Sequence, residues 1–154
     1  MLKINTSRIL LIALFAVLTF SLNAQMAIAV SKNNNGSSVK YAFETGKTID
    51  EALNNAVNAL KNAGAKNIFK LKSTEKTGHE LHEGYYVIIL SSRKVGGRFF
   101  LSYGLGASKD SKQDAIKKAV VHLKEFDWGY ENDMGYKIEK EGKIEDLYTP
   151  EEEK

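Results

Sequence analysis

The feature that most constrains the fold is a repeated helical segment. Residues 52–61 and 115–124 carry alanine, valine, leucine and lysine at the same places, and their apolar residues recur at the spacing of an amphipathic helix. A glycine precedes each segment, Gly46 in the first and Gly106 in the second, with three additional residues before the second helix. Any two amphipathic helices share some of this pattern, but the order of strands and turns around them also repeats. The sequence therefore predicts two structurally equivalent halves.

The segments around these helices have the composition of β-strands separated by polar, glycine-containing turns. In the first half we expect strands at 27–30 and 39–43, a turn at 32–37, a helix from Thr48 to Gly64 and a strand at 67–71. In the second half we expect strands at 85–90 and 98–103, a turn at 93–97, a loop at 104–108, a helix over 110–125 and a strand at 135–139. The Thr48 to Glu51 spacing is typical of a helix start.

This order predicts an α+β fold built from a duplicated strand-strand-helix-strand unit. We expect a mainly antiparallel sheet with two helices packed on one face. Neither half alone can bury a sufficient core, so the halves share one sheet or pack face to face within a single domain. The predicted domain spans residues 25–140, with repeats at about 26–74 and 84–140, and residues 141–154 are predicted to form an acidic flexible tail.

Residues 1–24 have the three parts of a secretory signal peptide. Lys3 and Arg8 precede an apolar run from Ile9 to Phe20, and Ala24 supplies the small residue at the cleavage site. A membrane anchor is the alternative, but a spanning helix needs about 20 apolar residues and this run is shorter. We therefore expect cleavage after Ala24, no membrane span in the mature chain, and a final location in the periplasm or outside the cell.

The charge of the chain is uneven. Without residues 1–24 there are 20 basic and 19 acidic residues, but residues 138–154 carry a net charge of −4, which leaves about +5 on residues 25–137. This excess favours an anionic macromolecular partner, yet it is far from the dense basic surface of a nucleic-acid-binding domain. We expect no nucleic-acid partner. The absence of cysteine excludes disulfides, a thiolate zinc site and redox chemistry.

Candidates for catalysis are sparse. His79 and His82 lie in the densest group of possible metal ligands, but their three-residue spacing does not match the helical zinc-protease motif, in which two histidines lie four residues apart. They are kept as weak metal candidates, and we expect no cofactor. His122 lies beside the apolar face of the second helix, where we expect a surface or boundary residue rather than a ligand.

Aromatic residues are concentrated in the second half, several of them beside basic ones. Tyr85 and Tyr86, and likewise Phe99 and Phe100, are neighbours within strands, so the members of each pair point to opposite faces. If helices cover one face, aromatic side chains on the other form a platform for a protein or a sugar ring. The alternative is that the tail or a second copy covers that face. The candidate binding residues are Tyr86, Arg93, Lys94, Arg98, Phe100, Tyr103, Trp128 and Tyr130.

The first strand and helix resemble a known group of proteins. The segment 27–31 (Ala-Ile-Ala-Val-Ser), a polar turn with glycine, Tyr41, and Thr48 ahead of an alanine-rich helix resemble a family of small exported bacterial domains of unknown function, over about 40 residues. Members of that family usually carry cysteines, which this chain lacks. The resemblance implies export and this type of fold.

These observations favour a non-enzymatic binding module. Small exported bacterial proteins of this kind include inhibitors and immunity proteins that neutralise toxins or hydrolases, and this is the function we favour by analogy. An envelope- or peptidoglycan-binding protein, whose basic body meets an anionic polymer, is the first alternative. A metal-dependent hydrolase that uses His79 and His82 is the second. The sequence leaves the oligomeric state open.

Overall fold

The computed structural model describes residues 25–34, 37–71 and 83–147. The predicted signal peptide, His79, His82 and residues 148–154 lie outside the described residues. The described elements are β1 (Gln25–Lys32), β2 (Ser38–Gly46), α2 (Ile49–Asn62), β3 (Ile68–Leu71), β4 (Tyr85–Val95), β5 (Arg98–Ser108), α3 (Lys112–Phe126) and β6 (Lys137–Lys143), with two 3-10 helices, η1 (Asn132–Met134) and η2 (Glu145–Leu147).

The first half forms a three-stranded antiparallel sheet in the order β2-β1-β3. Its helix, α2, begins after Thr48, whose Oγ1 accepts a hydrogen bond from the backbone N–H of Glu51 at 3.1 Å. The Glu51 carboxylate in turn accepts a hydrogen bond from the backbone N–H of Lys47 at 2.8 Å. These bonds satisfy amide groups that the first helical turn leaves without partners, which confirms the predicted helix start.

The second half repeats this order as a sheet β5-β4-β6. In each sheet the first strand of the half lies in the centre, and the other two strands lie at the edges. The helix α3 is capped by Ser111, whose Oγ accepts a hydrogen bond from the Asp114 N–H at 3.1 Å. Ser108, which lies two residues after Gly106 as Thr48 lies two residues after Gly46, instead ends β5. The halves therefore agree in strand order and in cap chemistry, in outline as a duplication predicts.

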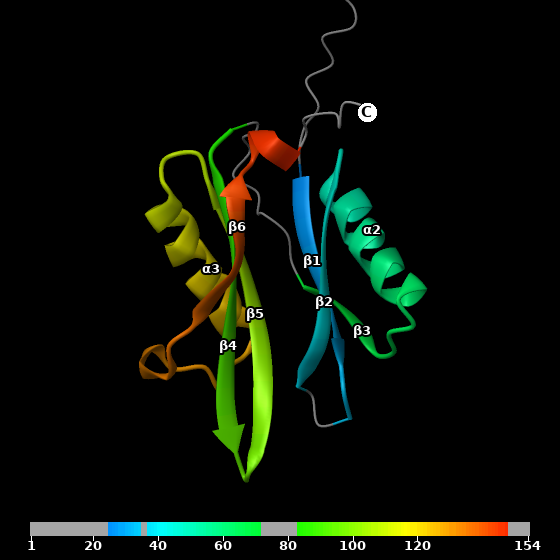
Figure 1. The fold of residues 1–154 in the computed structure, drawn as a ribbon, viewed down its shortest axis with the longest axis vertical. Helices are drawn as coiled ribbons and strands as arrows, with labels where there is room; N and C mark the ends of the chain where they lie inside the picture. The colour runs from blue at the N-terminus through cyan, green and yellow to red at the C-terminus, as the bar shows by residue number, and fades with distance from the viewer. Residues whose placement is uncertain (1–24, 35–36, 72–82, 148–154) are drawn as a thin grey trace, which may run out of the picture.

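The two sheets pack face to face, with one helix on each outer side (Figure 1). The α+β class and the antiparallel pairing are confirmed. Of the two predicted arrangements of the halves, face-to-face packing is found. The single sheet with both helices on one face is wrong, because β1 and β4 carry apolar residues at consecutive positions and so are apolar on both faces. Each sheet must bury one face under its own helix and the other face against the second sheet.

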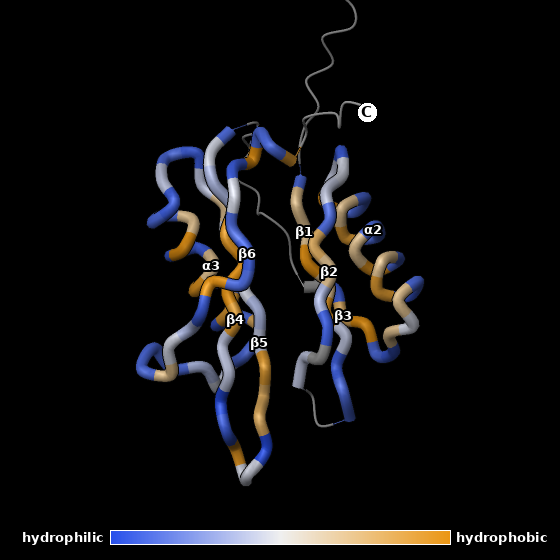
Figure 2. Tube along the Cα trace, in the orientation of Figure 1, coloured by the Kyte–Doolittle hydropathy of each residue, from blue (hydrophilic) through white to orange (hydrophobic). Residues whose placement is uncertain are grey.

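Alternate residues of the central strands fill the layer between the sheets. Ile28 of β1 and Ile88 of β4 are fully buried there. Two aromatic pairs cross the layer, with ring centroids 4.8 Å apart for Tyr41 and Tyr103 and 5.1 Å apart for Phe43 and Tyr86. Figure 2 shows apolar stretches along the central strands β1 and β4, whereas β6 is mostly hydrophilic. This layer is the common core of the two halves.

The opposite faces of the central strands meet the helices. Ala29 of β1 packs against Ala56 and Leu60 of α2. On the other side of the molecule, Val87 and Ile89 of β4 pack against the buried face of α3. The repeated alanines and leucines of the two helices therefore occupy equivalent places, each against its own sheet.

Residues 104–108, which we predicted as a loop, belong to β5. Gly104 and Gly106 lie where α3 touches the strand: a Cβ on Gly104 would meet the carbonyl oxygen of Ala119, and one on Gly106 would meet that of Ala115. The prediction was wrong because paired glycines usually indicate a turn. Here their missing side chains let the helix backbone lie directly on the strand.

The domain also continues past residue 140, where we predicted a flexible tail to begin. β6 extends to Lys143, and η2 follows it. Ile144, between them, is fully buried in the layer between the sheets, with Leu147 packed against the same core. The prediction rested on the acidic composition of this segment and overlooked the apolar side chain of Ile144. Residues 141–147 are part of the folded domain.

Substitution of Gly106 by alanine should destabilise the protein. The added methyl group must displace the α3 backbone, and overpacking of this kind costs about 1–3 kcal/mol. A thermal or urea unfolding curve measures the loss. Gly96→Ala serves as the comparison, because it strains a backbone with a positive φ of 56° but creates no clash: no atom lies within 4 Å of the added Cβ. Equal stability of Gly106→Ala and the unsubstituted protein would contradict the close helix–strand contact.

Candidate functional site

The β4–β5 hairpin extends beyond the other elements of the molecule (Figure 1). A partly buried ion pair joins its end, residues 93–100, to the loop of residues 127–136 that follows α3. Arg93 donates two hydrogen bonds to the Asp127 carboxylate, from Nε to Oδ2 and from Nη2 to Oδ1, both 3.0 Å long. We refer to residues 93–100 and 127–136 together as the hairpin–loop surface.

Two further donors hold the same carboxylate. The Ser102 hydroxyl donates to Oδ2 of Asp127 at 2.7 Å, and the Gly129 N–H donates to Oδ1 at 3.1 Å. Gly129 lies so close to Arg93 that a Cβ there would come 2.9 Å from the guanidinium carbon. Asp127 therefore fixes both the hairpin and the loop, and nothing in its sequence surroundings predicted that role.

Opposing effects act on the pKa of the Asp127 carboxyl. Burial raises the pKa, but hydrogen bonds from Arg93 and Ser102, the positive charge of Arg93 and the Gly129 N–H together lower it below its ordinary value of 3.8. The group is thus ionised at neutral pH, and both of its oxygens accept hydrogen bonds. This makes Asp127 a structural anion and not a proton donor.

Three of the predicted binding residues are buried. Tyr86 and Tyr103 point into the layer between the sheets, and Tyr130 packs in the core beneath α3. Their assignment to an exposed aromatic platform is wrong, because the other sheet covers Tyr86 and Tyr103, and Tyr130 is buried with the residues that pack under α3. Burial also raises the pKa of the Tyr103 hydroxyl, and the charge of Glu139 raises it further, so this group stays protonated.

The remaining predicted residues lie on the hairpin–loop surface. Lys94 and Arg98 are exposed, and Trp128 is 95% exposed. Of the Phe99–Phe100 pair, Phe99 is the exposed member, at 63%, while Phe100 is half-buried with the Arg93 guanidinium 5.0 Å from its ring centroid. Alternation along a strand predicts that one member of the pair is exposed, but it does not predict which one.

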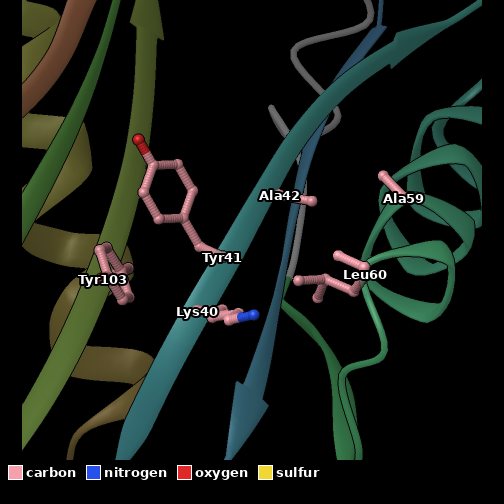
Figure 3. A pocket seen from close by; sticks show the side chains of 7 residues that line it. Lys40, Tyr41, Ala42, Ala59, Leu60 and Tyr103 are labelled. Atoms are coloured by element: carbon pink, nitrogen blue, oxygen red, sulfur yellow. The ribbon is translucent and has the colours of Figure 1, made fainter.

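An open depression of about 450 Å³ lies at the edge of β2 (Figure 3). Tyr41 points from β2 toward Tyr103 of β5, while Ala42 points toward α2. The other lining residues are Lys40, Ala59, Leu60 and Ala63. This lining is mainly apolar, and its ionisable groups are the Lys40 ammonium and the hydroxyls of Tyr41 and Tyr103.

His122 is buried, contrary to the expected surface position. Its Nδ1 accepts a hydrogen bond from the backbone N–H of Leu105 at 2.8 Å, and its ring lies edge-on to Phe126 with centroids 4.9 Å apart. The side chain therefore ties α3 to the outer edge of β5. Within residues 25–34, 37–71 and 83–147, no group of three or more histidine, cysteine or acidic residues could hold a metal ion.

Neither helix in the described part of the chain combines the length and apolar character needed to cross a membrane.

Replacement of Asp127 by asparagine should destabilise the protein by about 2–4 kcal/mol, because the substitution leaves the Arg93 guanidinium partly buried without its anion. Chemical unfolding measures the loss. Asp114→Asn is the matched control: Asp114 forms an ion pair with Lys118 at 2.9 Å, but both side chains are exposed. The control should lose much less stability. Similar losses for the two variants would contradict a special role for the Asp127 pair.

The same pair should make stability depend on pH. Because the pKa of Asp127 is lower in the folded protein, the carboxylate contributes stability above pH 3.8, and the contribution disappears as the pH falls below that value. The difference in unfolding free energy between the unsubstituted protein and Asp127→Asn should therefore shrink from neutral to acid pH. A difference that stays constant across this range would contradict the assignment.

Comparison with known proteins provides no assignment for this arrangement. Neither a family model, nor a curated protein, nor a solved structure matches the chain. We therefore infer a function from the chemistry of the exposed surface itself.

Proposed function

We propose that the protein is an exported, non-enzymatic binding module that holds a protein partner through the hairpin–loop surface, as an inhibitor or immunity protein does. The observation that supports this most is where the large apolar side chains are exposed. Those on the hairpin–loop surface are Val95, Phe99, Trp128, Met134 and Tyr136, whereas Phe69, Val121 and Ile138 are exposed elsewhere. Clusters of exposed apolar and aromatic residues commonly mark protein interaction sites.

The exposed charges of the hairpin are basic, whereas the loop carries the exposed acids Glu131 and Asp133, so the hairpin is the part of this surface that favours an acidic group of a partner. Lys94 lies with its Nζ 5.8 Å from the ring centroid of Phe99, which it faces on one side of the hairpin. Arg98 is exposed on the opposite side, across from Val95. Neither Lys94 nor Arg98 forms an ion pair with any described residue. Both cations are therefore available to acidic groups that border an apolar cleft in a partner.

The surface is also held in one conformation before binding. The Asp127 carboxylate accepts four hydrogen bonds from the hairpin and the loop. The Ser91 hydroxyl adds a further link by donating to the carbonyl oxygen of Gly135 at 3.0 Å. A preorganised surface loses less conformational entropy on association, which favours tight binding. The partly buried Arg93–Asp127 pair thus stabilises a binding surface, which favours binding over catalysis.

Affinity capture tests the proposal, with variants that reverse the charges of the hairpin–loop surface or shorten one of its aromatic side chains. The immobilised protein is incubated with envelope and secreted proteins, and retained proteins are quantified after washes at low and high salt. We expect a stoichiometric protein partner that the double variant Lys94→Glu/Arg98→Glu and the single variant Phe99→Ala retain at least tenfold less well, which corresponds to about 1.4 kcal/mol or more.

The control is Val121→Ala, which removes an exposed apolar side chain from α3, outside the hairpin–loop surface. It should retain the partner fully. Retention that is unchanged in all variants would contradict the proposed surface. Retention of anionic wall polymer in place of a protein, lost at high salt, would instead support the envelope-binding alternative.

A further inference from the structure

The four outer strands of the two sheets are not equally protected against pairing with another chain. An edge strand presents unpaired backbone groups, which proteins usually block with short length, charge, bulges or covering side chains. β3 has four residues. β6 is rich in lysine and glutamate, and its pairing with β4 has a register shift between Ile88 and Ile89.

The edge of β5 is covered by side chains. The Leu101 N–H donates to Ser37 Oγ at 3.0 Å, and the Leu105 N–H donates to His122 Nδ1 at 2.8 Å. Two outward-facing amides of this strand are thus satisfied within the protein. β2 is the remaining edge, with nine residues and the open depression beside it.

The hydrogen-bond pattern shows which backbone groups of β2 point outward. The Lys32 N–H bonds to Asn67 O on the β3 side, so the even-numbered residues of β1 face β3 and the odd-numbered ones face β2. Ala29 is therefore hydrogen-bonded to Ala42, and the backbone groups of Tyr41 and Phe43 point away from the sheet. Among the described residues, the side chain that caps this edge is Asn55, whose Nδ2 donates to Thr45 O at 2.9 Å.

We propose that β2 pairs antiparallel with β2 of a second copy of this chain, about a twofold axis at Ala42. In this register Tyr41 lies opposite Phe43 of the second copy, and both present outward-facing backbone groups, as a hydrogen-bonded pair requires. Lys40 then lies opposite Glu44 of the second copy, on the face that carries α2. Opposite charges directly across a strand pair stabilise the pairing.

The charges favour this register over its neighbours. Shifting the axis to Tyr41 would place Lys40 opposite Ala42, and shifting it to Phe43 would place Lys40 opposite Gly46. Lys40 and Glu44 form no ion pair with any described residue, so both are available for the pairing. The residues of α2 that line the depression beside β2 include Ala59 and Ala63, whose small side chains leave room for the incoming chain. The β2-β1-β3 sheets of the two copies would then form one continuous six-stranded sheet across an isologous dimer interface.

Charge exchange tests this register. The mass of the purified protein is measured by sedimentation over a concentration series, with circular dichroism as the check of folding. Lys40→Glu and Glu44→Lys should each abolish the dimer, because like charges then face each other. The double variant Lys40→Glu/Glu44→Lys should restore it, and so should an equimolar mixture of the two single variants.

A disulfide offers an independent readout, since the chain has no cysteine of its own. Facing Cα atoms at a non-hydrogen-bonded position are about 4.5 Å apart, within the range that a disulfide spans. Ala42→Cys should therefore crosslink two copies under mild oxidation, whereas Glu44→Cys, displaced from the axis, should not.

Lys94→Glu, on the hairpin–loop surface, is the control and should leave the dimer intact. A protein that stays monomeric at every concentration would overturn the proposal. A dimer that both single variants leave unchanged, or that Glu44→Cys crosslinks as well as Ala42→Cys does, would also overturn it. The sedimentation result is independent of the partner proposed for the hairpin–loop surface.

Discussion

β1 and β4 carry apolar side chains on both faces, and the rest of the structure depends on covering those faces. A helix covers one face of each sheet, and the other sheet covers the remaining face. Each half has too few residues to bury its sheet alone, so the layer between the sheets, with Ile28 and Ile88 at its centre, joins them into one domain. The buried tyrosines of this layer are structural for the same reason.

The arrangement leaves one part of the second sheet without a third strand. β6 pairs with β4 over residues 85–90, and from there to Val95 β5 is the only described strand that pairs with β4. A two-stranded ribbon is marginally stable in water, and here the Asp127 carboxylate and the loop after α3 support it. The exposed Phe99 and Trp128 are thus presented on a stiff support, which connects the packing of the domain to its proposed function.

The sequence predicted the local elements better than their assembly. The Thr48 cap, the strand pairs and the helices follow from short-range spacing, and Ala52 and Ala115 occupy equivalent places because both helices need a small residue where they cross a strand. Gly104 and Gly106 misled the prediction, since a glycine that admits a helix looks the same in sequence as one that makes a turn. Phe99 and Asp127 could not be singled out, because exposure and a partner 34 residues away depend on tertiary packing.

Native-state hydrogen exchange of the central amides of β1 and β4 tests most directly whether the two sheets share one core. If they do, these amides exchange with the same free energy of opening, and Ile88→Ala, which lies in β4, lowers the protection of β1 by the same amount as that of β4. A β1 strand that keeps its full protection while β4 loses it would contradict a common core. It would show instead that the two halves fold as separate units.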